Sequence, residues 1–256
     1  MGGRVRGGSA PASAVAMEAA AQAMESYRGR DNALRTACYA SRLFGGLLVA
    51  SDGPQRVALG RRLLLLSREL GGCRTVLRLF DSLSVYLQCR EYGLGAQEKD
   101  SIVRWSSVII NAADQLYYPC EHLAWAADTS IISIQAEGWW TATTLLWGLA
   151  LATGVVRSFR ALLLLRKRLR KSENRGHVQV GDSPTFSRKV YKMEVRAEIL
   201  NIISNLSDLG NAIHWMPAGF LWSGKFPDWL VGLMGSVSSL IGVYQMSCKK
   251  DLRKDL

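Results

Sequence analysis

The sequence predicts an all-α membrane protein, with amphipathic helices on the membrane surface followed by two transmembrane helices in the C-terminal half. The first observation is an uncharged stretch over residues 139–156 that runs directly into basic residues. The second is another uncharged stretch, over residues 229–247, which basic residues also follow. About 20 apolar residues in a helix cross the hydrocarbon core of a bilayer, and basic residues at the end of the helix lie among the headgroups. Two such spans predict an anchor in the form of a helical hairpin.

The charge balance indicates anionic partners. The 256 residues include 32 Lys and Arg against 21 Asp and Glu, which gives a formal net charge of +11. This excess favours acidic lipid or nucleic acid, and the two spans favour acidic phospholipids over nucleic acid. Five cysteines without a CxxC pair predict reduced thiols that face a cytosol-like compartment.

The N-terminal region begins with a segment that is poor in structure-forming residues. Gly, Ala, Ser and Pro dominate residues 1–23, so we expect a disordered tail and no secretory signal, and Met17 is an alternative start. A first helix is expected to end near the turn at residues 51–54, where Asp, Gly and Pro follow one another.

The clearest amphipathic pattern covers residues 61–83 and predicts a single helix. Apolar side chains recur there at spacings of three and four, and arginines occupy the other positions. The apolar residues are Leu63, Leu66, Leu70, Cys73, Leu77 and Phe80, and the basic ones are Arg61, Arg62, Arg68, Arg74 and Arg78. We interpret this helix as a lipid-binding element whose apolar face enters the headgroup boundary while the guanidinium groups bind lipid phosphates. The alternative is an ordinary surface helix packed on a core, and Gly71-Gly72 weakens either helix by about 1 kcal/mol per glycine.

Possible chemical groups gather in only one segment, residues 105–128. They are Asp114, Cys120, Glu121, His122 and Asp128. Consecutive residues on a helix point in different directions, and no paired Cys/His or HExxH signature is present. We therefore predict structural roles for these residues, with no catalytic, cofactor-binding or metal-binding site. Pro119 is expected to kink or interrupt the helix.

A basic, leucine-rich segment follows the first span. Its basic residues are Arg157, Arg160, Arg166, Lys167, Arg168, Arg170 and Lys171. Nucleic-acid binding is one interpretation, but a basic run directly after an apolar span is more typical of a juxtamembrane anchor. Helical periodicity resumes over residues 190–213, and a turn-rich stretch leads into the second span.

Small residues form a strip along the second span. Gly232, Gly235, Ser239 and Gly242 are three, four and three positions apart, so they share one helix face. Small residues allow two helix backbones to approach closely in lipid. We expect the strip to pack against a second copy of the chain or against the first span, although a passive role is also open.

Several short blocks, in this order, resemble the peroxin-eleven family of peroxisomal membrane proteins. They are Gly29-Arg30-Asp31 with Arg35 and Tyr39, then CRTVLRLF at residues 73–80, then GLMGSVSSLIG near the C-terminus. YGLGAQE at residues 92–98, NAADQLYYPCEH at 111–122 and the pair Trp139-Trp140 most resemble the gamma member. The resemblance covers residues 17 to about 248.

The resemblance implies a multi-pass protein of the peroxisomal membrane that promotes elongation, division and proliferation of the organelle, without catalysis or a cofactor. It implies cytosolic termini and a matrix location for the segment between the spans. Implied partners are further copies of the chain, other family members, the dynamin-like fission GTPase with its tail-anchored adaptors, and the import receptor for peroxisomal membrane proteins, which reads basic segments such as the one after the first span. We therefore divide the chain into six segments: a tail (1–23), a cytosolic-side amphipathic region (24–137), a first span (138–156), an inter-span segment (157–228), a second span (229–247) and a basic tail (248–256).

Two other classes of function remain open from the residues. An oligomeric pore or metabolite channel would need polar residues along the spans, and the candidates are Thr141, Thr143, Thr144, Ser236, Ser238 and Ser239. A lipid-modifying enzyme would need an acid or base at headgroup depth, for which Asp114 and His122 are the candidates.

Overall fold

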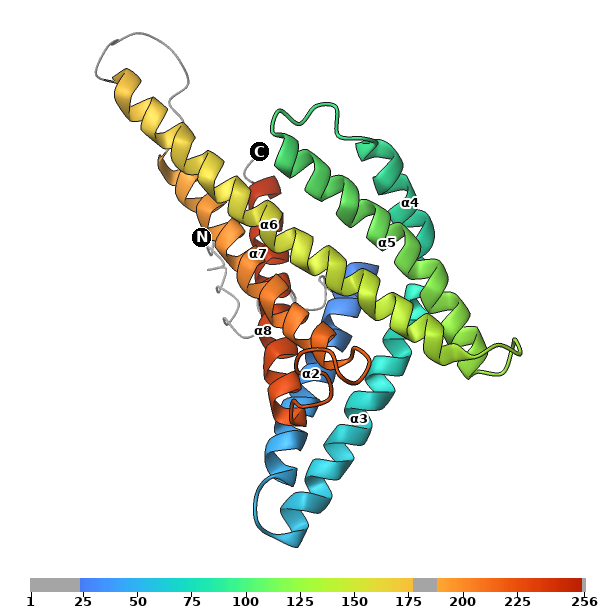
Figure 1. The fold of residues 1–256 in the computed structure, drawn as a ribbon. Coiled ribbons are helices and arrows are strands. Elements are labelled where there is room, and N and C mark those ends of the chain that lie inside the picture. The colour runs from blue at the N-terminus through green and yellow to red at the C-terminus, as the bar shows by residue number, and fades with distance from the viewer. Residues whose placement is uncertain (1–23, 177–187, 255–256) are drawn as a thin grey trace, which may run out of the picture.

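The computed structural model describes residues 24–176 and 188–254, and every regular element in these ranges is a helix (Figure 1). The all-α prediction is confirmed. The helices are α2 (Tyr27–Val49), α3 (Pro54–Arg78), α4 (Asp81–Tyr92), α5 (Ser101–Asp128), α6 (Ala136–Gly176), α7 (Arg188–His214) and α8 (Asp228–Lys254).

The helices α2 and α3 form an antiparallel hairpin around the predicted turn. Pro54 starts α3, where its fixed φ suits the first helical turn and its missing N–H costs no hydrogen bond. The two helices cross closely at two glycines, because a Cβ on Gly60 would lie 2.8 Å from the carbonyl oxygen of Gly45. The tight crossing positions the far end of α3 beside the beginning of α2, where the Tyr27 hydroxyl donates to the Leu77 carbonyl.

The helix predicted over residues 61–83 is instead divided between two elements. The helix α3 ends at Arg78, and α4 begins at Asp81, with a tight turn at Leu79 and Phe80. The Gly71-Gly72 pair, in contrast, lies within continuous α3. Packing against α2 keeps α3 helical across Gly71 and Gly72. The periodic apolar pattern alone did not reveal the turn at Leu79 and Phe80.

Of the two outcomes expected at Pro119, a kink or an interruption of the helix, the interruption does not occur. The helix α5 runs continuously through Pro119 and packs antiparallel to α6 along most of its length. Arg160 binds Asp100 near one end of this pair, and the Trp140 indole donates to Asp128 near the other. This packing stabilises α5 although proline removes one backbone hydrogen bond.

Two helices are long and apolar enough to cross a membrane, as the sequence predicts. The candidate spans are Ala136–Lys171 in α6 and Asp228–Cys248 in α8. The first candidate is longer than predicted, because the basic segment continues the same helix instead of forming a separate juxtamembrane element.

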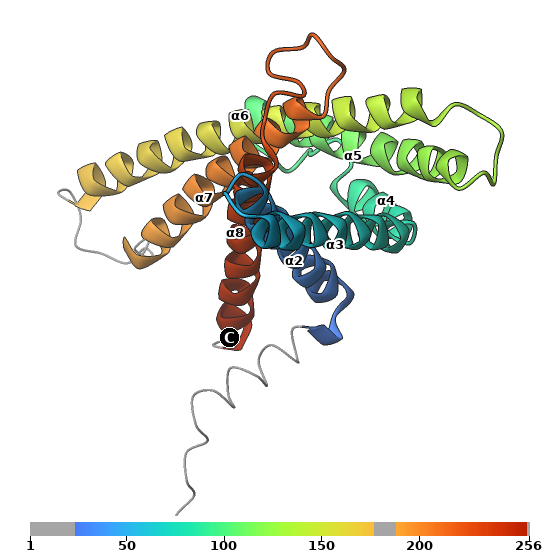
Figure 2. The ribbon, with the colours of Figure 1, turned by 90° about the horizontal axis from the view of Figure 1, so that it is seen from below.

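The helices α6 and α8 run in the same general direction, with α7 antiparallel to each of them (Figures 1 and 2). Gly154 of α6 contacts Asn205 of α7, and Ser238 of α8 donates to Asp208 of α7. In the described parts of the chain, α6 and α8 have no Cα atoms within 8 Å of each other. The helical hairpin expected from two consecutive spans is therefore not formed.

This topology gives the helix bundle two distinct ends. The beginning of α2, the end of α6, the beginning of α7 and the end of α8 lie toward one end, which we call the terminal end (Figure 1). The Asn32 amide contacts the sulfur of Met246 there. The connections at residues 50–53, 129–135 and 215–227 lie toward the opposite end, which we call the turn end.

Candidate membrane interface

The structure divides the predicted lipid-binding residues of α3 into exposed and packed groups. Leu66 and Phe80 are exposed, at 47% and 77% of their accessible area. Leu63, Leu70 and Leu77 are half-buried because α3 packs against α2. The basic residues Arg61, Arg62 and Arg68 are exposed, and Cys73 is exposed as well.

Arg74 and Arg78 bind carboxylates of the protein itself, in contrast to the prediction that they bind lipid phosphates. Arg74 forms an ion pair of 2.8 Å with Asp31 of α2. Arg78 donates two hydrogen bonds to Glu121 of α5, at 3.0 and 2.5 Å, and the Glu121 side chain is only 1% exposed. The Tyr117 hydroxyl donates a third hydrogen bond to this carboxylate. A buried charge requires such partners, so these two arginines connect helices of the protein.

The exposed apolar residues extend from the end of α3 along α4. Val76, Phe80, Leu83, Tyr86 and Leu87 have exposed side chains, and we call them the α3–α4 patch. Sequence reasoning missed the α4 part, although Phe80, Leu83 and Leu87 share spacings of three and four. The patch lies toward the terminal end, because the Leu77 carbonyl accepts a hydrogen bond from Tyr27, the first residue of α2.

The small-residue strip of α8 packs against α2 of the same chain. A Cβ on Gly235 would overlap the ring of Tyr39, and one on Gly232 would overlap the backbone of Leu43. Ser239 is also buried, whereas nothing lies within 4 Å of a Cβ on Gly242. The strip thus packs closely against α2, a partner that the sequence did not indicate. Of the four strip residues, only Gly242 is open to another helix.

An ion pair connects α2, α7 and α8 near the middle of the second candidate span. Arg35 of α2 lies 2.5 Å from Asp208 of α7 and donates to the Ser238 hydroxyl. Ser238 in turn donates to Asp208. A charged pair within a membrane is costly unless its groups have hydrogen-bond partners. Arg35, Asp208 and Ser238 supply these partners to one another. Sequence reasoning used Arg35 only as part of a family motif and did not find its partners.

The basic segment of α6 is mostly exposed. Arg166, Lys167, Arg168, Arg170 and Lys171 have exposed side chains. The two residues closest to the apolar stretch behave differently. Arg160 binds Asp100 at 2.8 Å, and Arg157 is half-buried.

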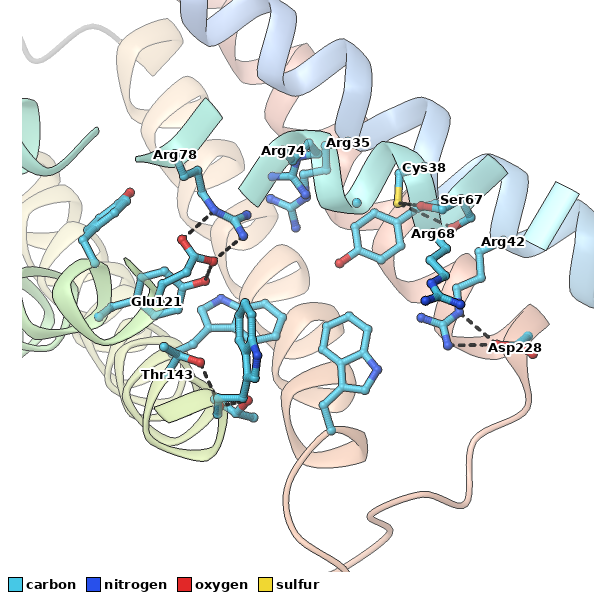
Figure 3. A pocket seen from close by; sticks show the side chains of 18 of the residues that line it. Arg35, Cys38, Arg42, Ser67, Arg68, Arg74, Arg78, Glu121, Thr143 and Asp228 are labelled. Atoms are coloured by element: carbon cyan, nitrogen blue, oxygen red, sulfur yellow. Dashed lines mark hydrogen bonds and ion pairs between the residues drawn. The ribbon is translucent and has the colours of Figure 1, made fainter. Parts of the chain in front are cut away.

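A cavity of about 790 Å³ lies between α2, α3, α5 and α6 (Figure 3). Five arginines line it, namely Arg35, Arg42, Arg68, Arg74 and Arg78, together with Asp114, Glu121 and Asp228. Aromatic side chains also line it, namely Tyr39, Tyr117, Tyr118, Trp140, Trp147 and Trp215. No motif in the sequence indicated this cavity, since its residues come from segments far apart in the chain.

Asp114 is a cavity residue whose carboxyl pKa is changed by the fold. Burial raises the pKa of Asp114 to about 6, above the ordinary value of 3.8. A raised carboxyl pKa means that the folded protein binds the proton more tightly than the unfolded chain, so Asp114 lowers stability as the pH rises from about 4 to about 6.

We expect the Asp114→Asn variant to remove this pH dependence. Its unfolding temperature should exceed that of the wild-type protein at pH 7 and match it near pH 4, where both side chains are neutral. Thermal unfolding of the purified protein in detergent at the two pH values measures the difference. An equal offset at both values would show that Asp114 does not titrate in this way.

Three of the six hydroxyl groups proposed to line a channel form hydrogen bonds within the described parts of the chain. Thr143 and Thr144 donate to the Trp140 carbonyl, Ser238 binds Asp208, and Ser239 is buried.

Among the described residues, no group of three His, Cys, Asp or Glu side chains is arranged to hold a metal ion.

Comparisons with known proteins agree with the resemblance noted from the sequence motifs. The family model for peroxisomal biogenesis factor 11 (PEX11) matches residues 17–247. Peroxisomal membrane protein 11C of Homo sapiens is 49% identical over 225 residues, which cover 88% of this chain and 92% of the human protein. The Mus musculus protein of the same name is 46% identical over the same coverage. No solved structure matches the chain. The chain therefore belongs to the PEX11 family of peroxisomal membrane proteins.

Proposed function

We propose that the protein promotes elongation, division and proliferation of peroxisomes by inserting the α3–α4 patch into the cytosolic leaflet of the membrane. The observation that carries this proposal is the exposure of large apolar side chains outside the two candidate spans, with Phe80 and Leu83 at 77% and 67%. Apolar side chains that enter one leaflet to headgroup depth expand that leaflet and bend the bilayer.

We further propose that the terminal end of the bundle faces the cytosol. The support is charge asymmetry. The end of α6 and the beginning of α7 are rich in Lys and Arg, whereas the three connections at the turn end contain a single basic residue, Lys225. Arg56, Arg61 and Arg62 in the first turns of α3 are the exception. Basic residues gather on the cytosolic side of membrane proteins. This orientation places the beginning of α2, the end of α6, the beginning of α7 and the end of α8 on the cytosolic side. It differs from the family resemblance, which implies a matrix location for the segment between the spans.

In this orientation α7 crosses the membrane between α6 and α8. Two helices that run in the same direction need a return crossing, and α7 has the required two faces. Ile199, Ile203 and Leu206 are exposed at spacings of four and three, while Asp208 and Asn211 are buried toward α8. An apolar outer face with paired polar groups inside is typical of helices within membrane bundles.

We expect an epitope tag inserted at Gly181 to be accessible on intact peroxisomes, together with a tag at the C-terminus. Protease added to purified organelles should remove both tags without permeabilisation, and a tag in the 129–135 connection should be protected until detergent is added. If the Gly181 tag is protected while the C-terminal tag is cleaved, α6 and α8 cross in opposite directions and the observed packing does not exist in the membrane.

The implied partners extend this proposal. We propose that protomers associate through the open surface around Gly242, and that this association concentrates the α3–α4 patches. We also propose that the exposed basic residues of α6, from Arg166 to Lys171, bind acidic phospholipid headgroups and the import receptor. The fission GTPase and its adaptors would then act on membrane that is already elongated.

Imaging of peroxisomes tests the proposed function. Expression of the protein above its normal level should produce elongated and then more numerous peroxisomes, and loss of the protein should produce fewer and larger ones. Unchanged number and shape in both conditions would refute the proposal.

A further inference from the structure

The cavity has an unpaired positive group and an unpaired negative group. Four of its five arginines have carboxylate partners, because Arg35, Arg42, Arg74 and Arg78 bind Asp208, Asp228, Asp31 and Glu121 respectively. Within residues 24–176 and 188–254, neither Arg68 nor Asp114 belongs to an ion pair. Among the charged residues that line the cavity, Arg68 and Asp114 are therefore the two without an ion-pair partner, one of each sign.

The two free charges belong to different parts of the cavity. Figure 3 shows Arg68 beside Arg42, near Asp228, while Arg78 and Glu121 lie toward the other side. Asp114 precedes Glu121 by two helical turns on α5, so it lies on the same helix face and belongs to the Glu121 side. The cavity is thus positive at its Arg68 side and negative at its Asp114 side.

The negative side also has aromatic walls. Tyr117 and Tyr118 lie one helical turn from Asp114, and Trp140 of α6 lines the same cavity. Aromatic faces attract ammonium groups, including quaternary ones, and a carboxylate among them adds a direct charge partner. Because the pKa of Asp114 is about 6, its carboxylate is mostly ionised at pH 7.

We propose that this cavity binds a zwitterionic headgroup of the phosphocholine or phosphoethanolamine type, with the phosphate at Arg68 and the ammonium at Asp114. Guanidinium groups are suited to phosphate, and the cavity volume of about 790 Å³ lies in the range of small-molecule sites. The site is distinct from the α3–α4 patch, so it can fail without affecting the proposed membrane insertion.

Binding to the full-length protein in maltoside micelles tests this site, with tryptophan fluorescence as the signal because three tryptophans line the cavity. The probes are dihexanoyl-phosphatidylcholine, dihexanoyl-phosphatidylglycerol, which has phosphate but no ammonium, and water-soluble glycerophosphocholine. The wild-type protein should bind the choline lipid about tenfold more tightly than the glycerol lipid, which corresponds to one charge-assisted contact. Glycerophosphocholine binding equal to that of the choline lipid would identify a soluble ligand, and weaker binding would identify a membrane lipid.

Three variants assign the contacts. Asp114→Asn should abolish the preference for choline while retaining affinity for the glycerol lipid, and Arg68→Gln should weaken binding of both lipids about tenfold. Arg56→Gln is the matched control, because Arg56 is exposed on the same helix and does not line the cavity. Thermal unfolding confirms that each variant is folded. Absence of saturable binding, equal affinity for the two lipids, or an unchanged preference in Asp114→Asn would overturn the proposal.

Discussion

Replacement of Phe80, Leu83 and Leu87 by glutamate is expected to abolish peroxisome elongation while leaving the protein folded and inserted. These three side chains are exposed, so a charge on them disturbs no internal packing. Each apolar side chain that enters the headgroup boundary contributes up to about 1.5–3 kcal/mol, and three carboxylates both remove this contribution and oppose insertion. Peroxisome length in cells that express the variant at the wild-type level measures the effect.

A matched control separates apolar insertion from added charge. Ser84 and Gln88 are exposed polar residues of α4, so the Ser84→Glu/Gln88→Glu variant adds carboxylates without removing apolar surface. This control should still elongate peroxisomes. Equal elongation by the wild-type protein and the Phe80/Leu83/Leu87 variant would show that the patch does not act on the membrane. Leu70 and Leu77 are less suitable targets, since they are half-buried.

The Gly235→Leu and Gly242→Leu variants are expected to differ sharply although both glycines belong to the same strip. A side chain at position 235 would overlap Tyr39, whereas position 242 is open. Overpacking costs about 1–3 kcal/mol or more where a backbone must shift, so Gly235→Leu should detach α2 from α8 and lower the unfolding temperature clearly. Gly242→Leu should leave the unfolding temperature unchanged and weaken only the association of differently tagged copies.

Thermal unfolding in detergent and co-purification of tagged copies check the two outcomes together. Equal unfolding temperatures for Gly235→Leu and the wild-type protein would contradict the packing of α2 on α8. Unchanged association in Gly242→Leu would place the oligomer contacts elsewhere, with the N-terminal helices as the remaining candidates.

The sequence predicted those parts of the fold that depend on local patterns. The two uncharged stretches identified the spans in α6 and α8, and periodicity over residues 190–213 identified α7. The turn at residues 51–54 followed from its Asp, Gly and Pro. In contrast, the continuation of α5 through Pro119 depends on packing against α6, which a local rule for proline does not contain.

The site was less predictable, because its contacts join residues far apart in the chain. An exposed arginine and one that binds a buried glutamate look alike in a periodic pattern, so Arg62 and Arg78 received the same interpretation. The strip on α8 correctly indicated close helix packing, but spacing alone does not identify the partner helix. Its partner, α2, contains Arg35 and Arg42, and such a charged helix resembles a surface helix until its carboxylate partners on α7 and α8 are known.

The most direct test of the central claim is reconstitution of the purified full-length protein into vesicles that contain acidic phospholipids, followed by electron cryomicroscopy of vesicle shape. The wild-type protein is predicted to convert round vesicles into tubules, and the Phe80/Leu83/Leu87→Glu variant is predicted to leave them round at the same protein-to-lipid ratio. Vesicles that stay round with the wild-type protein, or that form tubules equally with both proteins, would contradict the claim that the α3–α4 patch bends the membrane.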